Sequence, residues 1–354
     1  MKPFEGKRVL VTGGTGSLGK VLVNHLLSGV FGNPKKIIVF SRDEAKQDQM
    51  RTEFSYRRPV TAEVIYSEFK NVLDFRIGDV TDFSSISTAM RDADIVINAA
   101  AMKQVPTCEY FPYQAVKTNI LGAETIVRAI CEQDLPIETV VGISTDKACK
   151  PVNVMGCTKA IQERIFIGAN KICHKTKFVC VRYGNVLASR GSVIPLFLDQ
   201  IKRGGPVTIT TSDMTRFIIS LDQAVLLIAE AISSAQPGEI YVSKIASARV
   251  TDIAKALIGD LPIETRVVGI RPGEKTHEVL ISDEEIARTM SRGDYYVVKP
   301  ILREIWGEEG FDPILSKEFS SEDHIMDLEG VEAVLRENNL MPELLHSRSG
   351  ELLA

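Results

Sequence analysis

The start of the chain constrains the fold most, because an apolar run, a glycine-rich segment and a periodic apolar stretch follow one another directly. Arg8–Thr12 is the apolar run, Gly13–Gly19 carries a glycine at every third position, and apolar residues recur from Val21 to Leu27. This order predicts a strand, a tight turn and a helix. The amides of such a turn can approach a phosphate at the positive end of the helix dipole. We therefore expect a dinucleotide to bind through Gly13, Thr15, Gly16, Ser17, Leu18 and Gly19.

The same alternation continues through the first half of the chain. Helix-length segments separate further apolar runs, which we predict to be strands at Lys36–Phe40, Asp74–Ile77, Asp94–Ala99, Thr139–Ser144 and Phe178–Tyr183. Repeated β-α units predict an α/β protein with a doubly wound parallel sheet of the Rossmann type. After Asn185 the alternation stops, and Gly191–Pro195 and Lys202–Pro206 are predicted to be loops in a smaller, interleaved domain.

The residues after the second, third and fourth predicted strands bear on the choice of dinucleotide. An acidic residue commonly ends the second strand of an NAD site, whereas Ser41 and Arg42 follow Phe40 here. Because a guanidinium suits a 2′-phosphate, we expect NADP rather than NAD, the alternative for Arg42 being a solvated surface arginine. The contacts expected beyond the glycine turn are Ser41, Arg42, Lys46, Asp79, Val80, Ala99, Ala100, Ala101 and Asn119.

Met155 and Lys159 have the spacing of a Tyr-x-x-x-Lys dyad, with a thioether in place of the phenol. A thioether has no proton to transfer. Either the chemistry has been lost or the base lies elsewhere, and Ser144–Lys147 just upstream is the candidate. At i and i+4 the two side chains share one face of a helix. We expect Lys159 to bind the nicotinamide ribose and Met155 to pack as an apolar wall, the alternative being a surface lysine.

Several segments together resemble the extended short-chain dehydrogenase/reductase superfamily. They are Thr12–Gly19, Asn98–Ala101, Asn119, Ser144–Lys147, Met155-x-x-x-Lys159 and Arg182–Val186. A narrower set looks like the bacterial UDP-N-acetylglucosamine 4,6-dehydratases of polysaccharide and nonulosonic-acid biosynthesis. It comprises Ser41–Glu44, Ser144–Ala148, Gly191–Pro195, Met214–Phe217 and Arg271–Glu278, within a resemblance extending from about Val9 to Tyr296. Members of that family carry tyrosine or methionine at the position of Met155.

The resemblance implies a reaction in three steps. Hydride leaves sugar C4 for the nicotinamide, water is lost across C5 and C6, and the hydride returns to C6. A relay through Thr145 and Asp146 takes the C4 hydroxyl proton, Lys147 takes the C5 proton, and Asp146 protonates the leaving C6 hydroxyl. Lys147 must then act as a neutral amine, whereas a free lysine titrates near ~10.4. We expect burial and neighbouring positive charge to lower its pKa, and Asp146 and Lys147 to titrate as a coupled pair.

The resemblance also implies a pocket for a UDP-sugar, and UDP-N-acetylglucosamine in particular. Arg216 and Arg271 are the expected partners of the diphosphate, and Glu274 is the expected partner of the uridine ribose. Arg190–Val193 is expected to form a loop along the nucleotide. Taken singly, each of these residues is also compatible with a surface side chain. The full set of expected substrate contacts is Lys103, Asn185, Val193, Arg216, Arg271 and Glu274.

Composition and charge disfavour several other classes of function. With 42 basic and 46 acidic residues and no long basic run, the chain shows no footprint for nucleic acid or an anionic membrane. The apolar runs Ile95–Met102 and Ala224–Ile232 are too short to span a bilayer, and the N-terminus has no signal-peptide core. The cysteines lack metal-ligand spacing, so we expect no metal site, reduced thiols and a cytoplasmic location.

The domain boundaries are drawn where the pattern changes. Residues 1–186 and about 218–246 are assigned to the NADP-binding domain, 187–217 and 247–300 to the nucleotide-sugar domain, and 301–354 to a C-terminal extension with a helix from Gly330 to Glu337. Arg57–Lys70 is longer than a return between strands needs and is interpreted as an elaboration. The resemblance implies a homo-oligomer.

Three other functions remain open on the sequence alone. A UDP-sugar 4-epimerase would oxidise C4 without losing water, a related dehydratase would stop at a 5,6-alkene, and an NADP-sensing binding protein would have no turnover. Thr145–Lys147 argues against the epimerase, because epimerisation needs no acid at C6. The presence of Lys159, Asp146 and Lys147 argues against the sensor.

Overall fold

The computed structural model describes residues 2–56, 72–187, 192–307 and 314–342. The predicted elaboration at Arg57–Lys70 and the tail after Leu345 lie outside these residues, as do Arg190 and Gly191 of the expected nucleotide loop.

The central feature of the fold is a mostly parallel sheet, which has nine strands within the described residues. In spatial order they are β14 (Thr289–Arg292), β15 (Tyr295–Val298), β10 (Ile240–Ser243), β6 (Lys177–Arg182), β5 (Thr139–Ile143), β4 (Ile95–Asn98), β1 (Arg8–Thr12), β2 (Lys36–Ser41) and β3 (Leu73–Ile77). From β10 to β3 neighbouring strands pair parallel, and β15 and β14 add an antiparallel edge. The predicted doubly wound sheet is confirmed, and its order reverses between β1 and β4, where such sheets bind ligands.

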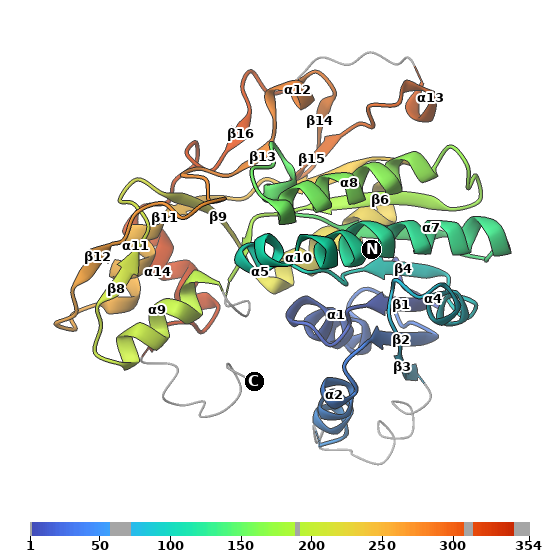
Figure 1. The fold of residues 1–354 in the computed structure, drawn as a ribbon, viewed down its shortest axis with the longest axis horizontal. Coiled ribbons are helices and arrows are strands. Elements are labelled where there is room, and N and C mark those ends of the chain that lie inside the picture. Colours follow the sequence, from blue (N-terminus) through green and yellow to red (C-terminus); the bar gives the residue numbers. More distant parts are fainter. Residues whose placement is uncertain (1, 57–71, 188–191, 308–313, 343–354) are drawn as a thin grey trace.

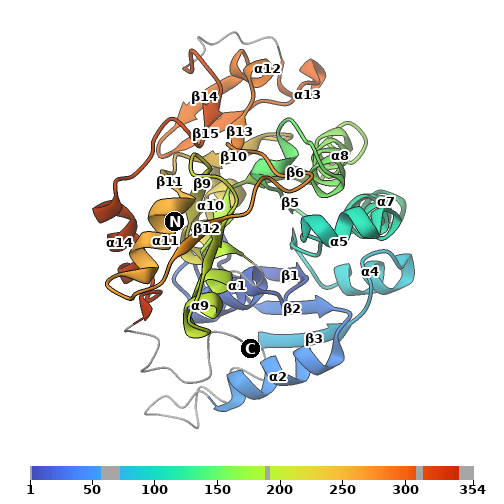
Figure 2. The ribbon, with the colours of Figure 1, turned by 60° about the vertical axis from the view of Figure 1, so that its left-hand side comes forward.

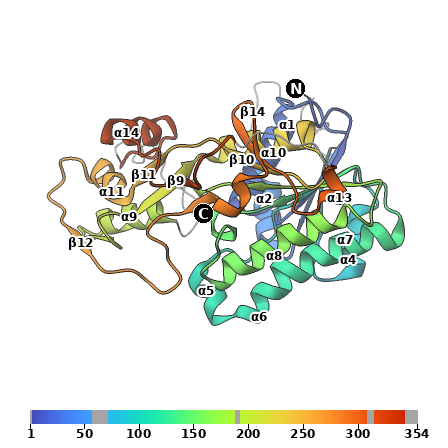
Figure 3. The same cartoon turned by 90° about the horizontal axis from the view of Figure 1, so that it is seen from above.

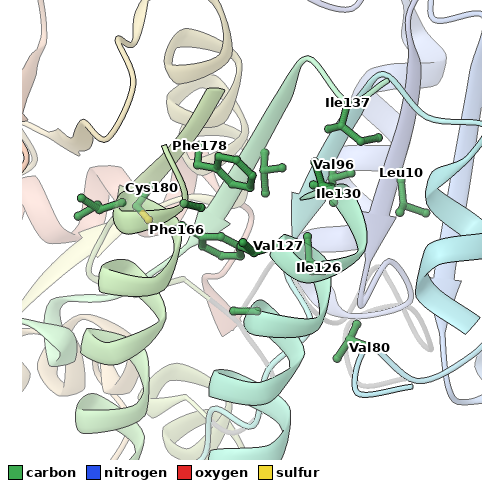
Figure 4. Packing of buried hydrophobic residues seen from close by; sticks show 14 of the residues in the cluster. Leu10, Val80, Val96, Ile126, Val127, Ile130, Ile137, Phe166, Phe178 and Cys180 are labelled. Atoms are coloured by element: carbon green, nitrogen blue, oxygen red, sulfur yellow. The ribbon is translucent and has the colours of Figure 1, made fainter. Parts of the chain in front are cut away.

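Helices cover both faces of the sheet (Figure 3). One face carries α1 (Ser17–Ser28) and α10 (Leu221–Ser234), and the other carries α4 (Phe83–Met90), α7 (Gly122–Gln133) and α8 (Val154–Ala169). Successive side chains of β1 point to opposite faces of the sheet, since Leu10 packs in one buried cluster while Val9 and Val11 pack in the other. In the first cluster, Phe166 of α8 packs on Phe178 of β6 (Figure 4).

A smaller unit stands to one side of the sheet (Figures 1 and 2). Its elements are β7 (Asn185–Val186), α9 (Val193–Lys202), β8 (Val207–Ile209), β9 (Thr215–Ile219), β11 (Ser247–Arg249), α11 (Val250–Ile258), β12 (Thr265–Val267) and α14 (Leu328–Glu337). Ile194, Phe197 and Leu335 share its buried core. The predicted loop at Gly191–Pro195 is wrong for Val193–Pro195, which form the first turn of α9 because Ile194 and Phe197 face that core. The predicted helix at Gly330–Glu337 is confirmed as α14.

The last third of the chain does not follow the predicted boundary at residue 300. β14 and β15 lie within 247–300, yet they belong to the large sheet rather than to the smaller unit, since β15 pairs with β10 and β14 pairs with β15. Downstream, β16 (Phe319–Ser320) pairs with β13 (Val279–Ile281), and α14 packs on α11. The described part of 301–354 is therefore integrated into the fold. The remaining short helices here are α12 (Asp283–Ile286) and α13 (Arg303–Trp306).

Two cysteines correct the expectation of reduced thiols. Cys131 and Cys173 form a disulfide, with their Cα atoms 5.6 Å apart. The pairing is possible because the end of α7 and the turn that follows α8 lie next to each other, a proximity that sequence spacing does not reveal. In the described ranges, no helix combines the length and the apolar character that crossing a membrane requires.

Candidate functional site

The glycine turn between β1 and α1 is shaped for a close backbone approach. Gly13 has a φ of +64°, and a Cβ there would lie 2.8 Å from the backbone of Ala100. A Cβ on Gly19 would lie 2.4 Å from the carbonyl oxygen of Gly14. Gly16 is the N-cap of α1 and has no side chain, so the first helical amides are not used by a capping side chain. This geometry fits a pyrophosphate held by backbone N–H groups.

The segment after β4 closes one side of this turn. Thr12 Oγ1 donates to Asn98 Oδ1 at 2.7 Å, and the Ala100 amide donates to Thr12 Oγ1 at 3.2 Å. Asn119, in the π-helix η1 (Val116–Leu121), accepts from the Met102 amide and donates to the Met102 carbonyl and to a threonine hydroxyl of α8. Its amide is thus engaged by protein groups, so Asn119 positions this segment.

The residues expected at the adenosine end lie after β2 and β3. The hydroxyl of Ser41 accepts a hydrogen bond from Gln47, and Arg42 is exposed, 3.5 Å from a carboxylate oxygen of Asp79. Lys46, near the start of α2 (Glu44–Tyr56), pairs with Asp43 at 2.6 Å. Val80 is buried. Arg42 and Asp79 thus lie side by side at the ends of β2 and β3.

Helix α8 presents Met155 and Lys159 on one buried face, as predicted. Lys159 Nζ donates to the Ile143 carbonyl at 2.8 Å and to Gln162 Oε1 at 2.9 Å. An ammonium has three donors, so one N–H has no partner among the described residues. Burial lowers the pKa of Lys159 to about 8. Met155 packs with Cys108 of α5 (Val105–Tyr110) and Ala115 of α6 (Pro112–Ala115), which agrees with an apolar wall.

The residues expected to carry the acid–base chemistry lie where β5 meets the short helix η2 (Asp146–Ala148). Asp146 is fully buried, and its Oδ1 accepts from Thr145 Oγ1 at 2.8 Å and from Lys147 Nζ at 2.9 Å. Its Oδ2 is buried without a hydrogen-bond partner in the described ranges. A Cβ on Gly156 would lie 2.2 Å from the Lys147 carbonyl oxygen, so only glycine lets α8 approach this turn so closely.

Sequence reasoning missed a second carboxyl beside Lys147. Glu278 Oε1 lies 3.6 Å from Lys147 Nζ, and the Glu278 side chain is only 3% exposed. Burial alone would lower the pKa of Lys147, but the charges of Asp146 and Glu278 outweigh it and raise that pKa. The protein's own groups therefore do not supply the expected lowering, which included the positive charge of the oxidised nicotinamide. Glu278 is the last residue of the Arg271–Glu278 motif and directly precedes the buried strand Val279–Ile281. An acidic residue next to an apolar run was the sequence signal that could have identified it.

The expected substrate residues divide into two groups. Asn185, Val193 and Arg216 line one hollow at the border of the smaller unit. Arg271 and Glu274 lie on the neighbouring loop, 3.9 Å apart, with Arg271 exposed and Glu274 half-buried. The loop is tied to α8, because Asn153 Nδ2 donates to the Gly273 carbonyl at 2.8 Å. Lys103 is exposed in the segment after β4.

Beneath the site, a buried ionic network holds several elements together. Arg182 of β6 bonds Glu163 of α8 and Glu285 of α12 through both of its terminal nitrogens and Nε. Glu163 Oε1 also accepts from the Ser144 hydroxyl at 2.5 Å. The network therefore fixes the residue that precedes Thr145.

Known proteins resemble this chain over most of its length. Residues 9–300 match a family described as polysaccharide biosynthesis protein. The chain is 41% identical over 311 residues to a Campylobacter jejuni protein named UDP-N-acetylglucosamine 4,6-dehydratase (inverting), with 87% of each covered. It is 42% identical over 298 residues to a Rickettsia bellii protein named UDP-glucose 4-epimerase, with 83% of each covered. The X-ray structure of Pen from Bacillus thuringiensis has 31% identity and a TM-score of 0.84, covering 96% of this chain and 99% of that one.

Proposed function

Because the chain belongs to the polysaccharide biosynthesis protein family, we propose that it is an NADP-dependent UDP-N-acetylglucosamine 4,6-dehydratase. The observation that carries the proposal is the hydrogen-bonded cluster of Thr145, Asp146 and Lys147 around the buried Asp146 carboxyl. A Campylobacter relative bears the dehydratase name, which supports the same activity.

The cofactor part of the proposal rests on the glycine turn. Glycines stand where a Cβ would collide, and the uncapped start of α1 suits a pyrophosphate. Arg42 would meet the 2′-phosphate of NADP, and the remaining N–H of Lys159 would bond the nicotinamide ribose. When bound, NADP would accept hydride from sugar C4 and return it to C6.

The protein's own residues would move the protons. Thr145 Oγ1 would take the C4 hydroxyl proton while passing its own to Asp146, along the 2.8 Å hydrogen bond between them. Lys147 would remove the C5 proton, which the C4 ketone acidifies. Asp146 would return its proton to the leaving C6 hydroxyl, releasing water. Lys147 would finally give its proton back to C5, so the net change is loss of one water.

A UDP-sugar 4-epimerase is the second candidate, because a relative with 42% identity bears that name. Epimerisation needs only the C4 steps. It gives no role to a buried acid and lysine pair beyond the C4 relay, and this favours the dehydratase.

Product analysis in deuterated water tests the proposal. Purified protein incubated with UDP-N-acetylglucosamine should give a 4-keto-6-deoxy sugar with deuterium at C5 by NMR. A 4-epimer without deuterium at C5 would establish the epimerase instead, and vinyl signals would indicate the 5,6-alkene. Mass spectrometry of the dinucleotide released on denaturation distinguishes NADP from NAD. Asp146→Asn should lower turnover by about 10²–10⁴-fold while dinucleotide binding is retained.

A further inference from the structure

Glu278 is a buried carboxyl beside Lys147 that the proton steps above do not use. Its backbone is fixed, because the Glu278 amide donates to Ser321 Oγ at 2.9 Å and the Ser321 amide donates to the Glu278 carbonyl at 2.8 Å. Oε1 faces Lys147 at 3.6 Å, whereas Oε2 is buried without a hydrogen-bond partner in the ranges that the structure describes. A buried carboxylate oxygen that lacks a donor is costly, which favours a proton there.

Charged groups from three segments face this carboxyl. Lys147 and Asp146 come from η2, Arg216 comes from β9, and Lys275 precedes Glu278 on its own segment. Lys275 Nζ already donates to the Cys149 carbonyl at 2.7 Å and lies 4.0 Å from Oε2. Burial, followed by Asp146, raises the pKa of Glu278 despite these cations. Lys147 Nζ, 3.6 Å from Oε1, is nearer to the carboxyl than Lys275 Nζ, which lies 4.0 Å from Oε2.

Asp146 cannot hold the Lys147 proton throughout the proposed cycle. In that cycle it receives the C4 hydroxyl proton and keeps it until the C6 hydroxyl leaves. Lys147 must nevertheless be a neutral amine at the same stage, so its own proton needs another acceptor. Glu278 is the second carboxyl within 4 Å of Lys147 Nζ in the described structure.

We infer that Glu278 is a positioning residue that accepts the proton of the Lys147 ammonium, so that Lys147 meets sugar C5 as a neutral amine. The inference rests on the proposed dehydratase function. The transfer breaks an N–H bond on Lys147 and forms an O–H bond on Glu278, which converts an ion pair into a neutral pair without changing the net charge. Substrate that excludes water from the site disfavours both ions and drives the transfer.

Competitive acetylation followed across pH by mass spectrometry measures the pKa of Lys147 without turnover. In the unaltered protein that pKa should lie above the value of a free lysine. Glu278→Gln should lower it, so that Lys147 is acetylated about tenfold faster at a fixed pH below its pKa. Glu322→Gln is the matched control, because this exposed carboxylate lies 3.7 Å from His277 and should leave Lys147 unchanged.

The pH dependence of kcat/KM tests the proton transfer itself. In Glu278→Gln, Lys147 must lose its proton to solvent, so kcat/KM should gain a limb that rises about tenfold per pH unit below the lysine pKa. The unaltered enzyme and Glu322→Gln should lack that limb. Unchanged acetylation of Lys147, or an unchanged pH profile, would overturn the inference.

Two further outcomes distinguish failure of this inference from misfolding of the variant and from failure of the proposed function. If Glu278→Gln does not fold, a Lys147 pKa at or below that of free lysine in the unaltered protein overturns it. Failure of the proposed function would instead appear as absence of the dehydration product from the unaltered enzyme, which the acetylation experiment does not measure.

Discussion

Lys159 is a buried lysine whose charge depends on pH within the working range of an enzyme. Burial lowers its pKa to about 8, with Cys180 and Glu163 opposing the effect. Below that pH the ammonium is charged and its third N–H can bond a ribose hydroxyl, while above it the charge is lost. The Kd for NADPH should therefore increase as pH rises through about 8.

Fluorescence titration of NADPH at a series of pH values checks this prediction. Lys159→Met should bind more weakly at neutral pH and show no break near 8, because no group with that pKa remains at the ribose. An equal break in the variant would assign the titration to another group.

Asn153 shows how one helix joins the two halves of the site. Its Oδ1 caps α8 by accepting from the Gly156 amide at 2.8 Å, and its Nδ2 holds the loop of Arg271 and Glu274 through Gly273. Asn153→Ala should cost about 1 kcal/mol for the cap and about 1 kcal/mol for the second hydrogen bond.

Asn153→Ser separates these two roles. Serine also caps helices, so this variant should recover about half of the lost stability in urea unfolding. Its KM for the UDP-sugar should remain raised, because serine has no amide to hold Gly273. A normal KM in both variants would show that the loop needs no such tether.

The elements that sequence predicted well are those with local signals. The strand, turn and helix at Arg8–Ser28 follow from apolar spacing and glycine placement, and the shared face of Met155 and Lys159 follows from the i, i+4 spacing. The contact of Lys147 with Glu278 joins residues far apart in the chain, and no periodicity records it. The resemblance identified Asn119, but its hydrogen bonds to Met102 are seen only in the structure.

At the scale of the whole molecule, the chain leaves the large sheet and returns to it. The hairpin β14–β15 completes that sheet although it lies within residues 247–300, which the sequence assigned to the smaller domain. Glu285 of α12, close to this hairpin, bonds Arg182 in the parallel part of the sheet. This buried ion pair therefore holds α12 against β6.

The contribution of the Arg182–Glu285 ion pair to the stability of the fold should depend on pH. Burial alone would raise the pKa of Glu285, but the charge and hydrogen bonds of Arg182 lower it from 4.5 to about 2. A lowered folded pKa means that the stabilisation is fully present above about 4.5 and is lost as pH falls toward 2. At neutral pH, Glu285→Gln should lower the free energy of unfolding by about 3 kcal/mol, because it leaves Arg182 partly unpaired.

Urea unfolding across this pH range tests both parts of the prediction. The difference between unaltered protein and Glu285→Gln should shrink as pH falls from 4.5 toward 2, since protonation removes the same charge that the variant lacks. Glu284→Gln, an exposed neighbour on α12, should change stability little at any pH. A difference independent of pH would mean that Glu285 stabilises the fold by packing and neutral hydrogen bonds, and that its charge does not fasten α12 to the sheet.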